Sequence, residues 1–159
     1  VIGFAMARIA GEPLHAWSEA AARRRLGVTP AQVVRVLLAL PPLTRHTLAL
    51  CCGASGAHNP IPVDVDFAKA AGLPDVIAHG MLSMAWLGRL LTNWVPQTDI
   101  REFSVRFAAM TQVGEAITAT GRVTEKLERD GQTLVRLDTQ TTNADGQVKL
   151  AGVALIAVP

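Results

Sequence analysis

The chain has 159 residues, of which 50% are hydrophobic, 18% are charged and 4% are aromatic, with a formal net charge of +2. This length suits one domain with a single core, and this composition excludes a disordered chain. The small net charge and the lack of tyrosine argue against a nucleic-acid-binding protein. The two cysteines are adjacent, so they cannot supply a disulfide framework or, by themselves, a tetrahedral metal site.

No apolar run reaches the about 20 residues that a membrane-spanning helix needs. The richest run, over residues 33–40, contains Arg35 and stops at two prolines. A secretory leader pattern is not recognisable either. We therefore expect an intracellular, cytoplasmic protein without a membrane span.

Two helices are predicted near the start of the chain. Residues 16–26 are good helix formers, and the arginine triplet at 23–25 is interpreted as a solvated helix end rather than an anion site. Thr29 and Pro30 offer an N-cap followed by a first-turn proline, which predicts a second helix over residues 31–40.

Three further helices are expected, over residues 44–52, 66–71 and 79–94. Thr44 is a possible cap for the first of them, and a loop rich in Gly, Ser, Asn and Pro follows it over residues 53–62. The third helix is apolar on nearly every face, including its methionines. A helix that is apolar all round is normally buried inside a domain.

The rest of the chain is dominated by strand patterns. Four strands are predicted, over residues 103–107, 117–127, 134–142 and 148–158. One Asp-Gly pair separates the second strand from the third, and another separates the third from the fourth, which is a strong hairpin signal. The expected fold class is therefore α+β, with an antiparallel sheet wrapped around a long central helix.

The most informative stretch covers residues 54–85 and reads ASGAHNPIPVDVDFAKAAGLPDVIAHGMLSMA. It resembles the signature of the MaoC-like (R)-specific enoyl-CoA hydratases and (R)-3-hydroxyacyl dehydratases, roughly S-G-D-x-N-P-I-H-x-D, then a helix, then I-A-H-G-M-L. The matching residues are Ser55, Gly56, Asn59, Pro60, Ile61, Asp64, Ala68, Gly72, Ile77, Ala78, His79, Gly80, Met81 and Leu82.

The resemblance implies a hot-dog fold over residues 42–159. It continues through Arg106 and Phe107, as in the V-R-F strand of the family. Residues 1–41 do not resemble the usual first strand of the family, so they are treated as an N-terminal extension.

The resemblance also implies a chemistry, the reversible hydration of a trans-2-enoyl thioester to an (R)-3-hydroxyacyl thioester. In the family an Asp and a His hold the attacking water and exchange protons, and a backbone N–H at the start of the buried helix stabilises the thioester oxygen. Acid-base groups and oriented dipoles suffice for this reaction, so no metal or organic cofactor is expected. The implied substrates are acyl-CoA or acyl carrier protein thioesters, and the implied assembly is a homodimer or a hot-dog heterodimer.

This sequence departs from the family pattern at the two decisive positions. The Asp of the family falls on Ala57 and its His falls on Pro62. Neither replacement can carry a proton. The roles that carry over are the backbone oxyanion donor at Gly80, a loop-shaping or water-holding role for Asn59, and a place beside the donor for His79.

Other residues near the loop have both a functional and a structural interpretation. His58 is either a replacement base or, as we favour, a surface or loop-bonding histidine. Asp64 is interpreted mainly as a local cap, and Asn59 as the start of a turn before a proline. The pair Cys51 and Cys52 is interpreted as helix-core packing, because no electropositive partner is apparent.

Three functional hypotheses remain open at this point. The chain is a non-catalytic partner that binds the acyl chain and supports an active hot-dog subunit, an active hydratase with altered residues, or a protein with another thioester role such as a thioesterase. The loss of both proton carriers favours the first of these.

Overall fold

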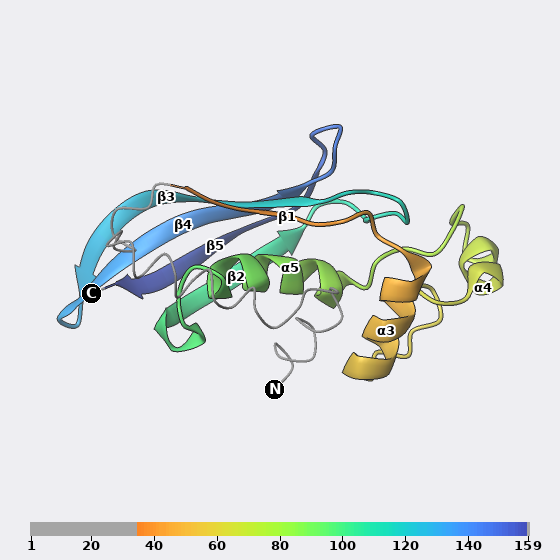
Figure 1. Ribbon diagram of the computed structural model, residues 1–159, viewed down its shortest axis with the longest axis horizontal. Helices are drawn as coiled ribbons and strands as arrows, with labels where there is room; N and C mark the ends of the chain where they lie inside the picture. Colours follow the sequence, from red (N-terminus) through yellow and green to blue (C-terminus); the bar gives the residue numbers. More distant parts are fainter. Residues whose placement is uncertain (1–34, 159) are drawn as a thin grey trace.

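The computed structural model describes residues 35–158 (Figure 1). The expectations for residues 16–34, including the arginine triplet, lie outside this part of the chain. The described elements, in chain order, are β1 (Arg35–Ala39), α3 (Arg45–Ser55), α4 (Val65–Ala70), α5 (Gly80–Thr92), a 3-10 turn η3 (Gln97–Asp99), β2 (Ile100–Phe107), β3 (Thr118–Arg129), β4 (Gln132–Thr142) and β5 (Val148–Val158).

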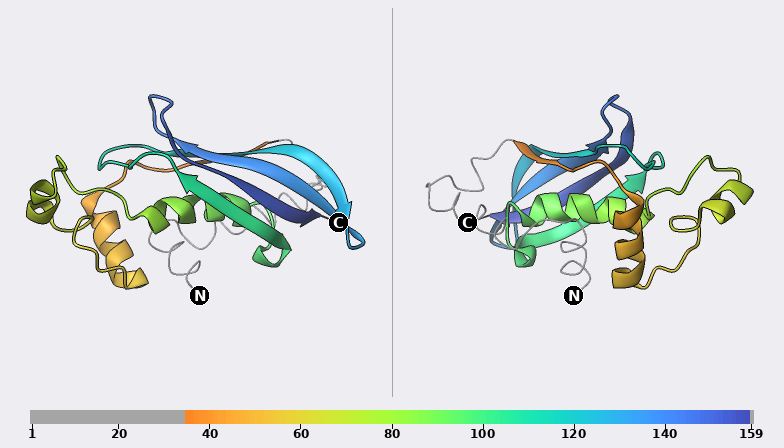
Figure 2. Two further views of the ribbon diagram at one scale, coloured as in Figure 1. Left: turned by 180° about the vertical axis from the view of Figure 1, so that it is seen from behind. Right: turned by 45° about the vertical axis from the view of Figure 1, so that its right-hand side comes forward.

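The five strands form one antiparallel sheet in the order β1-β3-β4-β5-β2. The sheet curves over α5, while α3 and α4 lie together beyond one end of it (Figures 1 and 2). This is the expected α+β architecture, and the four predicted strands are confirmed within a few residues at each end. Asp130 and Gly131 both adopt positive φ, at 51° and 72°, which is the geometry of the tight hairpin turn that the Asp-Gly pair predicts.

The predicted helix over residues 31–40 is wrong over its described part. Arg35–Ala39 is strand β1, which pairs with β3 from Thr118 to Arg122. Leu and Ala are good helix formers, but sheet pairing and the burial of alternate side chains decide the conformation here. The sheet thus includes a strand that precedes residue 42, where we expected the domain to begin.

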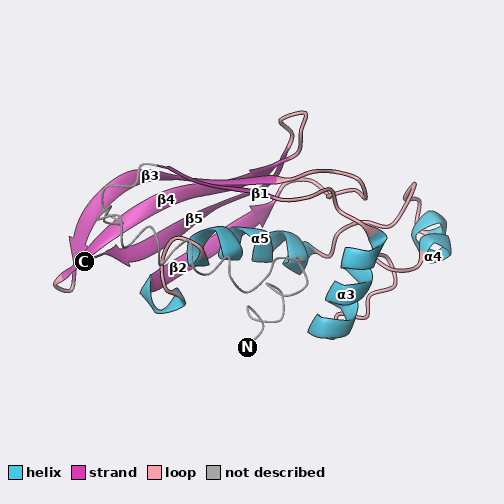
Figure 3. Cartoon of the chain, viewed as in Figure 1, coloured by secondary structure: helices cyan, strands magenta, loops and turns pink. Residues whose placement is uncertain are grey.

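Helix α5 contributes much of the hydrophobic core, as expected, and packs on β1, β2, β3 and β4 (Figure 3). Its buried apolar residues are Leu82, Trp86, Leu87, Leu90 and Leu91. The helix is not buried on every face, however, because the side chain of Met81 is 56% exposed. Ala85 and Gly88, at helical spacing from Met81, are half-buried, so this face is the less covered one. The core contacts of the helix are not confined to the sheet, because Leu82 and Trp86 pack in a cluster with residues of α3 and α4.

Gly121 in β3 faces side chains of β1, β4 and α5. A Cβ atom placed there would lie 2.8 Å from Cγ2 of Val36, 3.2 Å from Cδ2 of Leu137 and 3.5 Å from Cδ2 of Leu90 on α5. Real Cβ atoms almost never come within 3.0 Å of a neighbouring heavy atom. A side chain at this position would therefore displace Val36 or Leu137 on the two neighbouring strands, whereas its contact with Leu90 of α5 would be an ordinary one.

Candidate functional site at the start of helix α5

The signature segment starts where α3 ends. Gly56 caps this helix in the left-handed conformation, with φ at 69°, and its N–H donates to the carbonyl of Cys52 at 3.0 Å. The chain then turns through residues 57–62 into α4. This turn brings the Ala57 carbonyl to within 3.2 Å of Nε2 of His79, at the start of α5. Two segments that lie 22 residues apart in the sequence are thus joined at one place.

His79 fastens the loop to α5. It is the N-cap residue of this helix but makes no side-chain capping bond, and it is only 7% exposed. A carbonyl oxygen only accepts, so Nε2 donates to Ala57 and carries the proton of the neutral ring. Burial lowers the pKa of His79, against the weaker opposite effect of this hydrogen bond, which keeps the ring neutral. Its Nδ1 atom is left as a buried acceptor without a protein partner among residues 35–158.

Gly80, the first residue of α5, presents an unused backbone donor. The first hydrogen bonds of this helix run from the N–H groups of Leu82 and Ser83 to the His79 carbonyl, and no acceptor within residues 35–158 bonds the N–H of Gly80. The residue itself is exposed. The positive end of the helix dipole lies here, so a partly negative oxygen is favoured at this point.

Apolar side chains flank this donor. A Cβ atom at position 80 would lie 3.3 Å from Cε1 of Phe107, the last residue of β2. Phe107 is 52% exposed and Met81 is 56% exposed. The unused N–H therefore lies next to exposed apolar side chains. This combination suits a ligand with one polar carbonyl and an apolar chain.

Ala57 and Pro62, at the two positions where the resemblance places a proton-carrying pair, have no titratable side chain. Ala57 is half-buried and Pro62 is buried. The loop is thus bonded to α5, and the two positions that the resemblance assigns to the proton-carrying pair hold an alanine and a proline.

Asn59 and Asp64 have the local roles that their sequence context favours. Oδ1 of Asn59 accepts from the N–H of Ile61 at 3.1 Å, which is the predicted turn around the proline. Oδ1 of Asp64 accepts from the N–H groups of Asp66 and Phe67, both at 3.0 Å, so Asp64 caps α4. These side chains shape the loop from within.

The cysteine pair is only partly as expected. Cys51 is 1% exposed and packs in the core, but Cys52 is half-buried and its Sγ lies 3.4 Å from Nδ1 of His58. The interpretation of Cys52 as core packing without a polar partner is therefore wrong. It failed because the αL turn at Gly56 folds the loop back toward α3 and brings an exposed histidine to the thiol.

The two thiols are expected to differ in reactivity. Burial raises the pKa of the Cys51 thiol, whereas Cys52 is accessible and contacts an imidazole. Cys52 in a Cys51→Ala variant should react with iodoacetamide at least about tenfold faster than Cys51 in a Cys52→Ala variant. Mass spectrometry of timed samples at pH 7.5 measures both rates, and equal rates would contradict the observed burial.

Residues 35–158 contain no group of three or more His, Cys, Asp or Glu side chains that could hold a metal ion. Among the described helices, none has both the length and the apolarity needed to cross a membrane. The features that define the site are the Gly80 donor, the His79 contact and the exposed apolar surface next to them.

A sequence model of the family described as MaoC like domain matches residues 27–145, about three quarters of the chain. The chain belongs to the MaoC-like family. Among curated relatives of this MaoC-like chain, the (R)-specific enoyl-CoA hydratase of Rhodospirillum rubrum is 30% identical over 119 residues, covering 74% of this chain and 81% of the relative.

Another relative is longer than this MaoC-like chain. The enoyl-CoA hydratase ChsH3 of Mycobacterium tuberculosis is 29% identical over 134 residues, which cover 81% of the chain. The match spans only 43% of the length of ChsH3. The chain therefore corresponds to less than half of that protein.

Solved structures show the same fold as the MaoC-like chain. The R-hydratase PhaJ1 of Pseudomonas aeruginosa in its unliganded form has a TM-score of 0.73 and 25% identity, covering 83% of this chain and 86% of the other. The ChsH1-ChsH2 complex of Mycobacterium tuberculosis has a TM-score of 0.67 at 19% identity, covering 80% of this chain and 98% of the compared chain. The hot-dog fold expected from the signature is confirmed.

Proposed function

We propose that this MaoC-like chain binds fatty acyl thioesters at the start of α5 and acts as the non-catalytic partner of an active hot-dog subunit. The unused N–H of Gly80, exposed beside a loop that lacks both proton carriers, is the observation that carries the proposal. The thioester carbonyl would accept a hydrogen bond from this N–H. The acyl chain would lie against Phe107 and Met81, which are both about half exposed.

The hydration itself needs proton transfer at two atoms of the substrate. Water adds to C3 of the enoyl thioester and loses a proton, while C2 gains one. An alanine methyl and a proline ring at positions 57 and 62 can neither accept nor donate these protons. The Gly80 donor would still polarise the thioester carbonyl, so binding is retained where turnover is lost.

The edge of the sheet supports a partner subunit. Strand β2 pairs only with β5 within the described residues, so its outer edge has free N–H and C=O groups. Phe107 lies on this same strand and over Gly80. A second hot-dog unit added at β2 would cover the exposed ring and complete one wall of the thioester site.

A second candidate is an active hydratase in which His79 handles the proton. It is favoured by the buried Nδ1 atom of His79, which has no protein partner within residues 35–158 and can accept a proton because the ring is held neutral. The hydration assay described below separates this candidate from the first.

The purified chain is expected to bind crotonyl-CoA without hydrating it above the uncatalysed rate. Isothermal titration calorimetry measures the binding, and the ultraviolet absorbance of the enoyl thioester measures the hydration. A Gly80→Pro variant, which removes the N–H, should weaken the binding because the oxyanion donor is lost.

Two outcomes would contradict the proposed partner role. Turnover by the wild-type chain that is lost in a His79→Gln variant would establish the second candidate instead. Failure of the chain to co-purify with a co-expressed, catalytically intact hot-dog subunit would argue against the partner assignment.

A further inference from the structure

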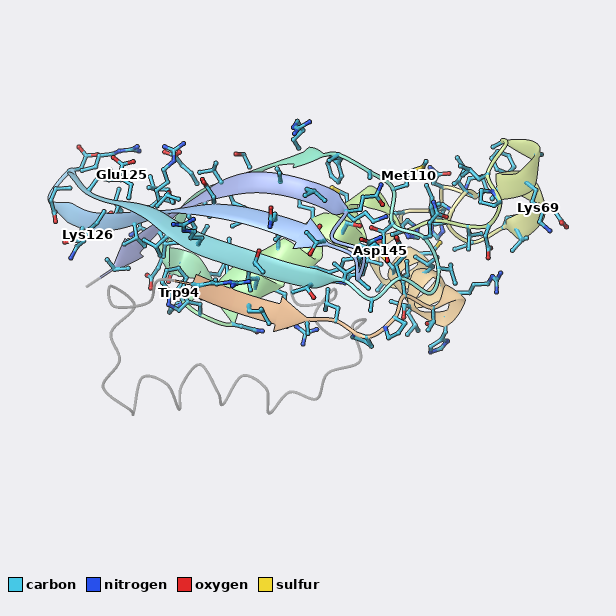
Figure 4. The ribbon with its side chains drawn as sticks, turned by 90° about the horizontal axis from the view of Figure 1, so that it is seen from above. Lys69, Trp94, Met110, Glu125, Lys126 and Asp145 are labelled. Carbon is cyan, nitrogen blue, oxygen red and sulfur yellow. The ribbon has the colours of Figure 1, made fainter. Side chains whose placement is uncertain are left out.

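A buried lysine lies at the start of β5, next to Leu150, which pairs with Phe107 of β2. The side chain of Lys149 is 3% exposed, and its Nζ donates to Oε1 of Glu115 at 2.7 Å and to the carbonyl of Met110 at 2.9 Å. Both acceptors belong to the loop that follows β2, at the end of the sheet nearer to α4 (Figure 4). Burying an ammonium group is unfavourable unless it is paired and hydrogen-bonded, and Lys149 meets both conditions.

Glu115 is the centre of the contact. Its Oε1 also accepts from Nδ2 of Asn143 at 2.8 Å, and its Oε2 accepts from the backbone N–H of Gln112 at 2.7 Å. Burial acts to raise the pKa of Glu115, but the hydrogen bonds from Lys149, Gln112 and Asn143 outweigh it and hold the pKa below its ordinary value. The carboxylate is therefore charged at neutral pH. Its three contacts join the loop to Lys149 of β5, to Asn143 and to the loop's own backbone at Gln112.

The loop in turn fastens the segment that leads into α5. Gln112 forms an antiparallel bridge with Ile77, and the N–H of Ala78 donates to the Thr111 carbonyl at 2.9 Å. Residues 77 and 78 directly precede His79 and Gly80. The ammonium group is thus connected to the residues just before Gly80 through the Glu115 carboxylate, the backbone of Gln112 and Thr111, and the backbone of Ile77 and Ala78.

The same loop holds the segment that leads into α3. The N–H of Leu43 donates to the Glu115 carbonyl at 2.9 Å, and the N–H of Gly114 donates to the Leu43 carbonyl at 2.7 Å. The C-terminal end of α3 carries the loop that His79 contacts. The loop that this ion pair holds is therefore hydrogen-bonded to both of the segments that meet at the candidate site.

We infer that the Lys149–Glu115 ion pair is a positioning device for the Gly80 amide, an inference that rests on the proposed role of this amide in binding the thioester. A pair of apolar side chains would fill the same volume without the desolvation cost. The ammonium group differs from such a pair because it must meet two fixed acceptors, Glu115 and the Met110 carbonyl. This requirement selects one geometry of the loop and, through Ile77 and Ala78, one orientation of the start of α5.

The test compares three variants of the full chain. Lys149→Met keeps the length of the side chain and removes the charge, and Glu115→Gln keeps the shape of the acceptor. Arg129→Met is the matched control, because Arg129 pairs with Glu102 at 2.8 Å on the surface, where both side chains are more than half exposed. The readouts are the ¹H–¹⁵N resonance of the Gly80 amide, the dissociation constant for crotonyl-CoA, and the midpoint of urea unfolding.

Lys149→Met is expected to move the Gly80 resonance and to weaken crotonyl-CoA binding about tenfold, because small displacements at a binding group are costly. Glu115→Gln should change both in the same direction by a smaller amount, and Arg129→Met should change neither. If Lys149→Met does not fold, the Gly80 resonance and the crotonyl-CoA affinity of Glu115→Gln test the inference instead.

A lower urea midpoint with an unchanged Gly80 resonance and unchanged affinity would show that the pair is only structural and would overturn the inference. The proposed function fails separately, if the wild-type chain does not bind crotonyl-CoA. The positioning of the amide would still be supported in that case by a shifted Gly80 resonance in both variants.

Discussion

Restoring Asp at position 57 and His at position 62 together is expected to give the chain hydratase activity. The resemblance places the proton-carrying pair at Ala57 and Pro62, in a loop that is bonded to the start of α5 through the Ala57 carbonyl. A positioned acid-base group contributes about 10²-fold to 10⁴-fold to such a reaction. The Ala57→Asp, Pro62→His double variant should therefore hydrate crotonyl-CoA at least about 10²-fold faster than the wild-type chain, as measured by the loss of enoyl thioester absorbance.

The matched control carries neutral side chains of similar size, Ala57→Asn with Pro62→Gln. It should remain at the wild-type level, because amides of this kind do not exchange protons near neutral pH. Each single substitution should also fall well short of the pair. A double variant that has the wild-type circular dichroism spectrum but no activity would contradict the proposed position of the loop relative to Gly80.

The substitution Gly152→Ala should be among the most destabilising in the chain. A Cβ atom at this position in β5 would lie 2.1 Å from the carbonyl oxygen of Ser104 and 3.0 Å from Cα of Val105. Both are backbone atoms of β2, so no side-chain rotation can relieve the overlap. We expect a loss of more than about 3 kcal/mol in the free energy of unfolding, measured by urea titration, because β2 must move away from β5.

Gly53→Ala serves as the comparison for this prediction. Gly53 lies in α3, and a Cβ atom there meets no heavy atom within 4 Å. Alanine is favoured over glycine inside a helix, so this variant should gain about 0.5–1 kcal/mol. If Gly152→Ala proved as stable as the wild-type chain, the close pairing of β2 with β5 at Ser104 would be disproved.

The elements with strong local patterns could be predicted from the sequence. The Asp-Gly pairs identify both hairpins. Asp130 and Gly131 both have positive φ angles, which few other residue pairs accept in succession, whereas at the second turn only Gly146 has a positive φ. Helix α5 follows from its long apolar run. Strand β1 could not be predicted in this way, since the segment RVLLA fits a helix equally well and only its pairing with β3 makes it a strand.

In the candidate site, too, the local contacts could be predicted from the sequence and the long-range contacts could not. The turn at Asn59 and the cap at Asp64 depend on neighbours within three residues, so the sequence is enough to predict them. The contacts of His79 with Ala57 and of Lys149 with Glu115 join residues 22 and 34 positions apart. No periodicity or motif in the sequence marks such pairs, because the fold alone brings them together.

The tight packing at Gly121 bears on the length of substrate that the site can accept. Val36, Leu137 and Leu90 surround this position, so an added carbon atom there would displace Val36 or Leu137. In the proposed thioester site, the tail of a long acyl chain would then lie along the less covered face of α5, beside Met81. Only the first few carbons would be enclosed by this subunit, and any discrimination among longer tails would be made by whatever covers that face.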